Sequence, residues 1–104
     1  MATVNATTQA GGVANFASGS FTSDNTATVV TLGFKPRCIK VINSTDVIVW
    51  EKIEGMAAAN SVKTTSSGTT TVDTGSAVLI ADLSFTISAT AAGSSKAISW
   101  IAIA

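Results

Sequence analysis

The chain has 104 residues, which is the size of one domain and leaves no room for separate catalytic and substrate-binding lobes. Only 12% of the residues are charged, 46% are apolar, and six basic and six acidic side chains cancel to a net charge of zero. This composition argues against binding to nucleic acid or to an anionic membrane, which both depend on clustered Lys and Arg, and it favours a surface that rests against other proteins.

The first twenty residues contain few bulky side chains and many Ala, Thr, Asn and Gly. Such a segment cannot bury enough apolar surface to fold by itself, so residues 1–20 are predicted to form an extended N-terminal arm that becomes ordered against a neighbouring subunit. A flexible terminus without a partner is the alternative. Val4 and Val13 are among its few larger apolar groups and are its candidate contact residues. The segment lacks the basic start and apolar stretch of a secretion signal, which predicts synthesis in the cytoplasm.

The next part of the chain has the composition of strands. Residues 26–32 are mostly β-branched and predict a strand that ends at Gly33, before Pro36 interrupts the pattern. Strands are also predicted at 37–42 and 47–53, and the short polar side chains of 43–46 predict a hairpin turn between them. Both faces of this hairpin carry apolar side chains, which is typical of strands covered on both sides by a second sheet, a loop or another subunit.

The remaining segments continue the β pattern. Residues 54–60 have helical propensity for only a turn or two. Further strands are predicted at 69–74, 77–81 and 84–89, and the apolar C-terminal segment 96–104 is predicted to be held in a sheet. About six to eight short strands between turn signals predict an all-β fold, a small antiparallel β-sandwich or barrel, spanning residues 21–104.

Few side chains are available for chemistry. The chain has no His and no Tyr, and Cys38 is its only cysteine, which is predicted to be a small buried hydrophobe. Without His, the commonest general base, thiol-activating partner and transition-metal ligand are missing. Glu51 and Glu54 could pair for glycoside hydrolysis or calcium binding, but no motif flanks them and isolated surface acids are the preferred interpretation. The sequence therefore predicts no enzyme, no cofactor and no metal site.

Three segments together resemble a known family. They read GFKPR at 33–37, IKVINSTD at 39–46 and WEKIEGM at 50–56, and Lys63-Thr64 and Gly68-Thr69 follow at matching spacing. In this respect the chain is similar to small virion structural proteins of tailed bacteriophages and prophages, which carry a GF-x-P-R step, a V-x-N-x-T-D turn and an E-G-M segment. The resemblance covers residues 26–104 and implies a capsid decoration (cement) protein without catalytic residues.

The resemblance also implies partners and a location. Such a protein binds the outer surface of the phage head, clamps neighbouring subunits of the major capsid protein and associates with copies of itself, commonly as a trimer. A tail-fibre or tail-tip binding module, or a tail tube or adaptor protein, is the alternative, because related modules occur in tail fibres. In the domain, Phe34, Arg37, Trp50 and Met56 are the candidate interface residues, since aromatic anchors dominate buried interface energy. Core packing is the alternative for Phe34 and Trp50, and for Trp100 it is the preferred interpretation.

Overall fold

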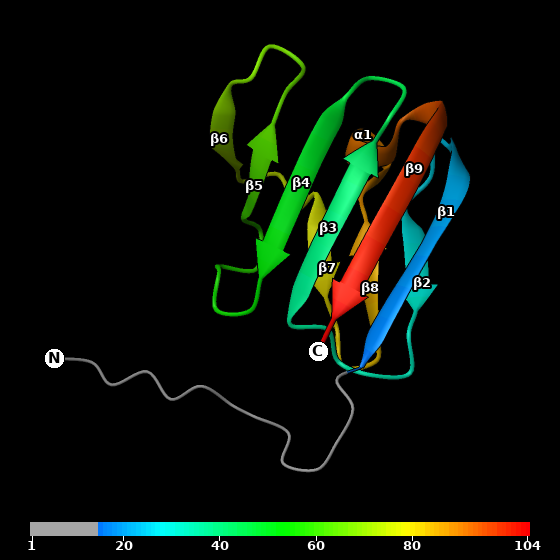
Figure 1. Cartoon of the computed structure of the whole chain (residues 1–104), viewed down its shortest axis with the longest axis vertical. Coiled ribbons are helices and arrows are strands. Elements are labelled where there is room, and N and C mark those ends of the chain that lie inside the picture. The colour runs from blue at the N-terminus through cyan, green and yellow to red at the C-terminus, as the bar shows by residue number, and fades with distance from the viewer. Residues whose placement is uncertain (1–14) are drawn as a thin grey trace, which may run out of the picture.

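The computed structural model describes residues 15–104, which form two antiparallel β-sheets lying face to face (Figure 1). The larger sheet has the strand order β1-β9-β3-β4-β5-β6 and the smaller sheet the order β2-β8-β7. The strands of the larger sheet are β1 (Phe16–Asp24), β9 (Ser94–Ile103), β3 (Cys38–Asn43), β4 (Ile48–Ile53), β5 (Ser61–Thr64) and β6 (Thr70–Asp73). Those of the smaller sheet are β2 (Thr28–Thr31), β8 (Ser84–Ile87) and β7 (Val78–Ile80), and one helical turn, α1, spans Ala89–Ala92. The predicted all-β, antiparallel fold is confirmed.

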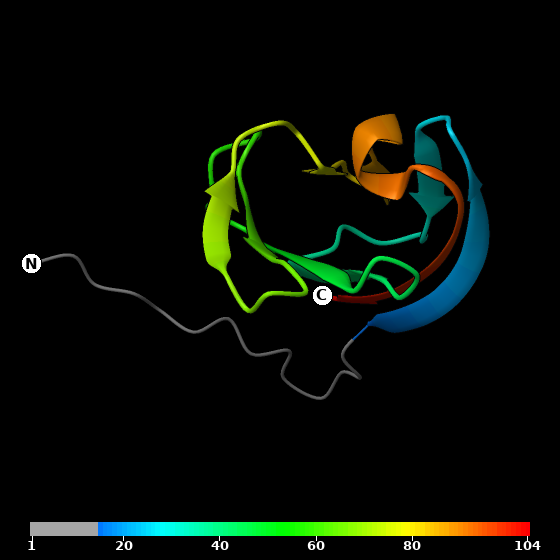
Figure 2. The same cartoon turned by 90° about the horizontal axis from the view of Figure 1, so that it is seen from above.

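The larger sheet is curved. Seen from above, it wraps around the smaller sheet and α1, so that its two edge strands turn toward them and its outer face is convex (Figure 2). This curvature follows from the right-handed twist of strands, which accumulates across a wide sheet. Among residues 15–104, the outer face is therefore the side of the larger sheet that no other element covers.

The core fills the space between the two sheets. Side chains alternate between faces along each strand, so every second residue of β3, β4 and β9 points inward. Fully or almost fully buried apolar side chains come from both sheets and from α1, namely Ile39, Val41, Trp50, Ala77, Val78, Phe85, Ile87, Ala91, Ala92, Ile98 and Ala102. The rings of Phe85 and Trp100 meet edge to face with centroids 5.3 Å apart, which links the smaller sheet to β9. Trp100 therefore packs against the core, as expected from the sequence.

The boundary predicted for the arm needs correction at its C-terminal end. Strand β1 begins at Phe16 and pairs along its length with β9, so residues 16–20 belong to the sheet. The indole of Trp100 lies directly against the backbone of Gly19. Only glycine fits there, because a Cβ at this position would lie 2.8 Å from Cζ2 of the indole. The small residues of this segment thus allow close packing and do not indicate an unstructured chain. Residues 1–14, the rest of the predicted arm, lie outside the described residues.

Three further elements differ from the sequence prediction. Strand β5 was not predicted, since it is short and polar and is held by pairing to β4 and β6. Residues 54–60 form turns and no helix, while α1 occupies part of a segment predicted as strand and loop. Ser88 caps α1 by accepting a hydrogen bond from the Ala91 N–H at its Oγ, 3.1 Å away. In β5, strand pairing outweighed a weak local signal.

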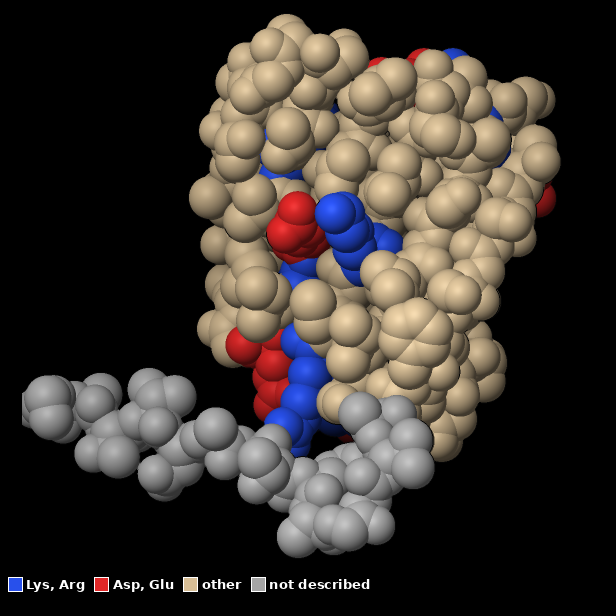
Figure 3. Space-filling model, viewed as in Figure 1, with Lys and Arg blue, Asp and Glu red and all other residues tan. Residues whose placement is uncertain are grey.

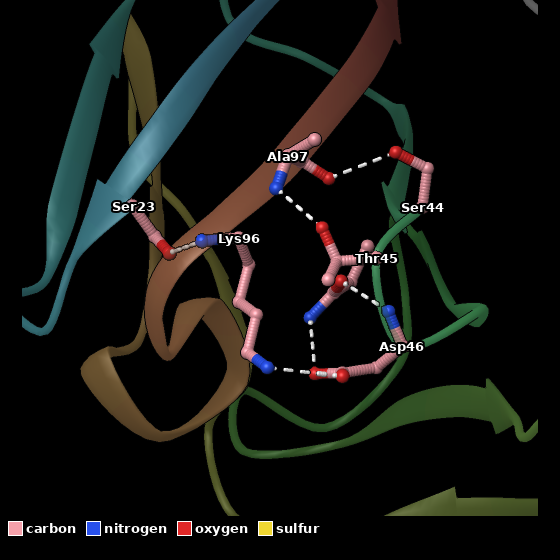
Figure 4. A network of polar contacts seen from close by, with 7 residues as sticks. Ser23, Ser44, Thr45, Asp46, Lys96 and Ala97 are labelled. Atoms are coloured by element: carbon pink, nitrogen blue, oxygen red, sulfur yellow. Dashed lines mark hydrogen bonds and ion pairs between the residues drawn. The ribbon is translucent and has the colours of Figure 1, made fainter.

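A polar network fixes the turn between β3 and β4 to the start of β9 (Figure 4). Buried Asn43 accepts a hydrogen bond from the Asp46 N–H over 3.0 Å and donates from Nδ2 to Oδ2 of Asp46 over 3.2 Å. The other carboxylate oxygen of Asp46 accepts from Nζ of Lys96 at 3.1 Å. The Ala97 N–H donates to Oγ1 of Thr45 at 2.9 Å. The turn chemistry of residues 43–46 therefore closes the hairpin and also anchors a third strand.

At the end of β1, Thr26 donates hydrogen bonds to the Asp24 carboxylate from its hydroxyl and its backbone N–H. The hydroxyl bond is the main cause that lowers the pKa of Asp24 below its ordinary value of 3.8. Because the pKa is lowered in the folded state, the stabilisation is present above pH 3.8 and is lost as the pH falls through the lowered pKa. We expect Thr26→Val to raise the pKa of Asp24, measured by NMR titration, whereas Thr22→Val should leave it unchanged. An Asp24 titration identical in Thr26→Val and the parent would contradict this assignment.

Candidate interaction surface

The outer face of the larger sheet carries an apolar row at one end. The strand register places Phe16, Ile103, Cys38 and Ile53 side by side on four neighbouring strands. Phe16 is 60% exposed, Ile53 54% and Ile103 39%, and Cys38 is half-buried. Cys38 therefore lies at the surface of the sheet and not in the core, contrary to the sequence prediction.

Two more rows cross the middle and the far part of this face. The middle row runs from β1 to β6 and consists of Ser18, Ile101, Lys40, Glu51, Val62 and Val72. The third row consists of Ser20, Ser99, Ile42, Val49, Thr64 and Thr70. We call these three rows together the outer face. Aliphatic and small hydroxyl side chains occupy most of it, which is unusual for a sheet surface open to water.

Charge is scarce on this side of the molecule. In Figure 3, which looks onto it, uncharged atoms cover most of the surface, and the charged side chains form a narrow band. Lys40 and Glu51 are exposed and lie directly opposite each other on β3 and β4. Within residues 15–104 the ion pairs are Arg37–Glu54 and Lys96–Asp46, so neither Lys40 nor Glu51 is paired there. The outer face therefore combines apolar rows with one unpaired cation and one unpaired anion at its centre.

The predicted interface residues do not form one surface. Phe34 is half-buried and packs against the core. Arg37 is exposed and its Nε lies 3.6 Å from Oε2 of Glu54, and Met56, at the same end of the hairpin, is partly buried. Val4 and Val13 lie outside the described residues. The sequence of the hairpin has apolar residues on both faces, and this pattern does not indicate which face the smaller sheet covers.

Trp50 is the candidate that the structure corrects. Its side chain is 3% exposed and belongs to the core, and its Nε1–H donates to Oδ2 of Asp73 over 3.1 Å. The indole therefore joins β4 to the edge strand β6, and almost none of it is exposed for contact with a partner. Side chains alternate between the two faces of β4, so Val49 and Glu51 point outward and Trp50, between them, points inward.

A pocket of about 250 Å³ lies where the 54–58 segment meets β7. Its lining includes Lys35, Lys52, Met56 and Leu79. Nζ of Lys52 donates to the carbonyl oxygens of Ala57, Ala58 and Asn60 at 2.7, 2.9 and 2.6 Å. Burial lowers the pKa of Lys52, but all three donors of its ammonium group are engaged. We therefore assign Lys52 to holding the 57–60 segment and not to chemistry.

The two acidic residues considered for catalysis, Glu51 and Glu54, lie in different parts of the hairpin and do not form a pair. Glu54 pairs with Arg37 at the end of the hairpin, whereas Glu51 lies on the outer face. Among residues 15–104, no group of three or more His, Cys, Asp or Glu side chains could hold a metal ion. The same residues contain no helix with the length and apolar character needed to cross a membrane.

Comparisons of the chain with protein-family models, with curated protein sequences and with solved structures find no match.

Proposed function

We propose that the chain is a non-enzymatic structural protein of a virion, a capsid decoration (cement) protein that binds the outer surface of a phage head and stabilises it. The observation that carries the proposal is the outer face, a wide, apolar and charge-poor sheet surface that the described part of the chain, residues 15–104, leaves uncovered. Surfaces of this kind mark sites of protein association. The motifs at 33–37, 39–46 and 50–56 support the virion setting through the family they resemble.

The physical mechanism is mass action. A protein that binds the assembled shell but not its separated subunits stabilises the shell by its binding free energy at each occupied site. A rigid two-sheet domain suits this role, because little conformational entropy is lost when a preformed surface binds. The major capsid protein and copies of the chain itself are the proposed partners, and a zero net charge keeps long-range attraction to nucleic acid low.

The test compares particles of the encoding phage with and without this protein. We expect particles lacking it to assemble but to release DNA at lower temperature, measured by dye access during heating. Adding the purified protein back should restore the release temperature in proportion to occupancy. Rebinding should persist at about 0.5 M salt, where screening acts over only a few ångströms, because apolar contact rather than ion pairing holds the protein.

Two outcomes would reject this function. Equal heat lability of the two kinds of particle would exclude a cementing role. Loss of adsorption to host cells in the particles without the protein would instead assign it to a tail fibre or tail tip. Copy number separates the same alternatives, since a decoration protein covers a lattice and a fibre tip does not.

A further inference from the structure

We infer that the occupant of the outer face is a second copy of the chain, packed face to face about a two-fold axis that runs parallel to the strands between β3 and β4. This inference rests on the proposed role of the outer face as an association surface and assigns that surface to the second of the two proposed partners, a copy of the chain, so that the capsid protein is contacted by other surfaces of the dimer. It follows from the strand register, because the face is complementary to itself about this one axis.

The charges at the centre select the axis. Lys40 on β3 and Glu51 on β4 are directly opposite each other in the register. A two-fold axis along the strands exchanges the positions of β3 and β4, so Lys40 of one copy lies over Glu51 of the other, and the contact occurs twice. An axis across the strands would instead place Lys40 over Lys40, which is unfavourable. Among residues 15–104 both side chains lack an ion-pair partner and are exposed, so both are available.

The same axis matches the other positions of β3 and β4 and two positions of the strands beside them, β9 and β5. Ile42 lies over Val49 of the second copy, and Cys38 lies over its Ile53. One strand further out, β9 of one copy covers β5 of the other, which places Ile101 over Val62 and Ser99 over Thr64. Apolar groups therefore meet apolar groups, hydroxyls meet hydroxyls, and the only charges meet their opposites. Stacked sheets about 10 Å apart with nearly aligned strands accommodate such contacts.

The size and curvature of the face set the strength of the contact. Because both copies present a convex face, the contact is centred on β3 and β4 and extends outward no further than β9 and β5 (Figure 2). At about 4.8 Å between strands and about 20 Å along them, their flat footprint is on the order of 400 Å². This is about half of the roughly 800 Å² per partner that a standard stable interface buries, and it lies in the range of weak, transient association. We therefore expect a dimer with a dissociation constant in the micromolar range, with no net charge to oppose it.

The experiment is a charge exchange followed by sedimentation equilibrium of the purified full chain from about 1 to 500 µM, a range that brackets a micromolar constant. The parent should be a monomer–dimer system. Lys40→Glu and Glu51→Lys should each weaken dimerisation by about tenfold or more, since each places like charges opposite each other twice. The double variant Lys40→Glu/Glu51→Lys should recover the parent constant. An equimolar mixture of the two single variants should form a heterodimer, because one carries two acids and the other two bases.

Matched controls change the net charge equally at exposed positions away from the outer face. Lys35→Glu is the control for Lys40→Glu, and Asp82→Lys is the control for Glu51→Lys; both should dimerise like the parent. Circular dichroism and thermal melting check that every variant is folded. A parent that remains monomeric at 500 µM, a trimer, or a dimer that is indifferent to both single reversals would overturn the inference.

The dimer and the proposed function fail separately. A chain that stays monomeric yet restores the heat resistance of bare particles would reject the two-fold pairing and leave the decoration role standing. A chain that dimerises as described but leaves the heat resistance of bare particles unchanged would reject the decoration role and leave the two-fold pairing standing.

Discussion

Replacing Phe85 with alanine is expected to remove about 3–5 kcal/mol of the free energy of unfolding. Phe85 is 0% exposed, lies on the central strand of the smaller sheet and contacts the ring of Trp100 edge to face. Its removal leaves a cavity between the two sheets, where few small groups can move in to fill the space. A domain of this size has about 5–15 kcal/mol in total, so the variant should lose a large share of its stability. Urea unfolding followed by tryptophan fluorescence measures the loss.

Phe16→Ala is the matched control for this change. Phe16 is 60% exposed on the outer face, so the same deletion there removes little buried surface. We expect less than about 1 kcal/mol, measured at a protein concentration well below that needed for dimerisation. Similar losses at the two positions would mean that Phe85 is not the centre of the core.

Replacing Lys52 with methionine is expected to cost about 2–4 kcal/mol and to loosen the 57–60 segment. The methylene stem keeps its packing, but the carbonyls of Ala57, Ala58 and Asn60 lose the ammonium group that binds all three. Hydrogen bonds to charged groups are stronger than neutral ones, and the partly buried carbonyls regain only some of this from water. Part of the loss is offset because the buried charge no longer has to be desolvated.

Two measurements separate this effect from a general loss of stability. Hydrogen exchange should accelerate in residues 54–61 more than in β3 or β9, because the lost bonds are local. Lys35→Met, a control at an exposed lysine beside the same pocket, should change the free energy of unfolding by less than about 0.5 kcal/mol. Unaltered exchange in 54–61 would show that Lys52 does not hold this segment.

Local sequence was sufficient for the elements whose signals lie within a few residues. The β-branched run around Val29 and Val30, the hairpin with its polar turn at 43–46, and the apolar C-terminal segment were all predicted as strands or turns and are observed as such. In each, β propensity, the turn residues and the apolar pattern agree. Strand β5 lacks that agreement. Its residues, Ser61–Thr64, are mostly polar, and they form a strand because they pair with β4 on one side and β6 on the other.

The candidate surface was only half visible in the sequence. The apolar character of both faces of 37–53 indicated that something covers each, and Trp50, an interface candidate with core packing as its alternative, lies on the side that packs into the core. A period of two defines two faces but does not say which is inside when both are apolar. The structure decides through the smaller sheet, whose Phe85 and Ile87 occupy one side of the larger sheet.

By itself, the sequence determined an all-β domain that contains no His or Tyr and only 12% charged residues, because composition and local pattern carry that information. Tertiary structure alone decided that β1 and β9, from opposite ends of the chain, pair beside β3, and that Lys40 and Glu51 stand at the centre of an exposed apolar face. The physical reason is that strand pairing is non-local: hydrogen bonds between strands far apart in the chain set the register, and the register sets which side chains share a surface.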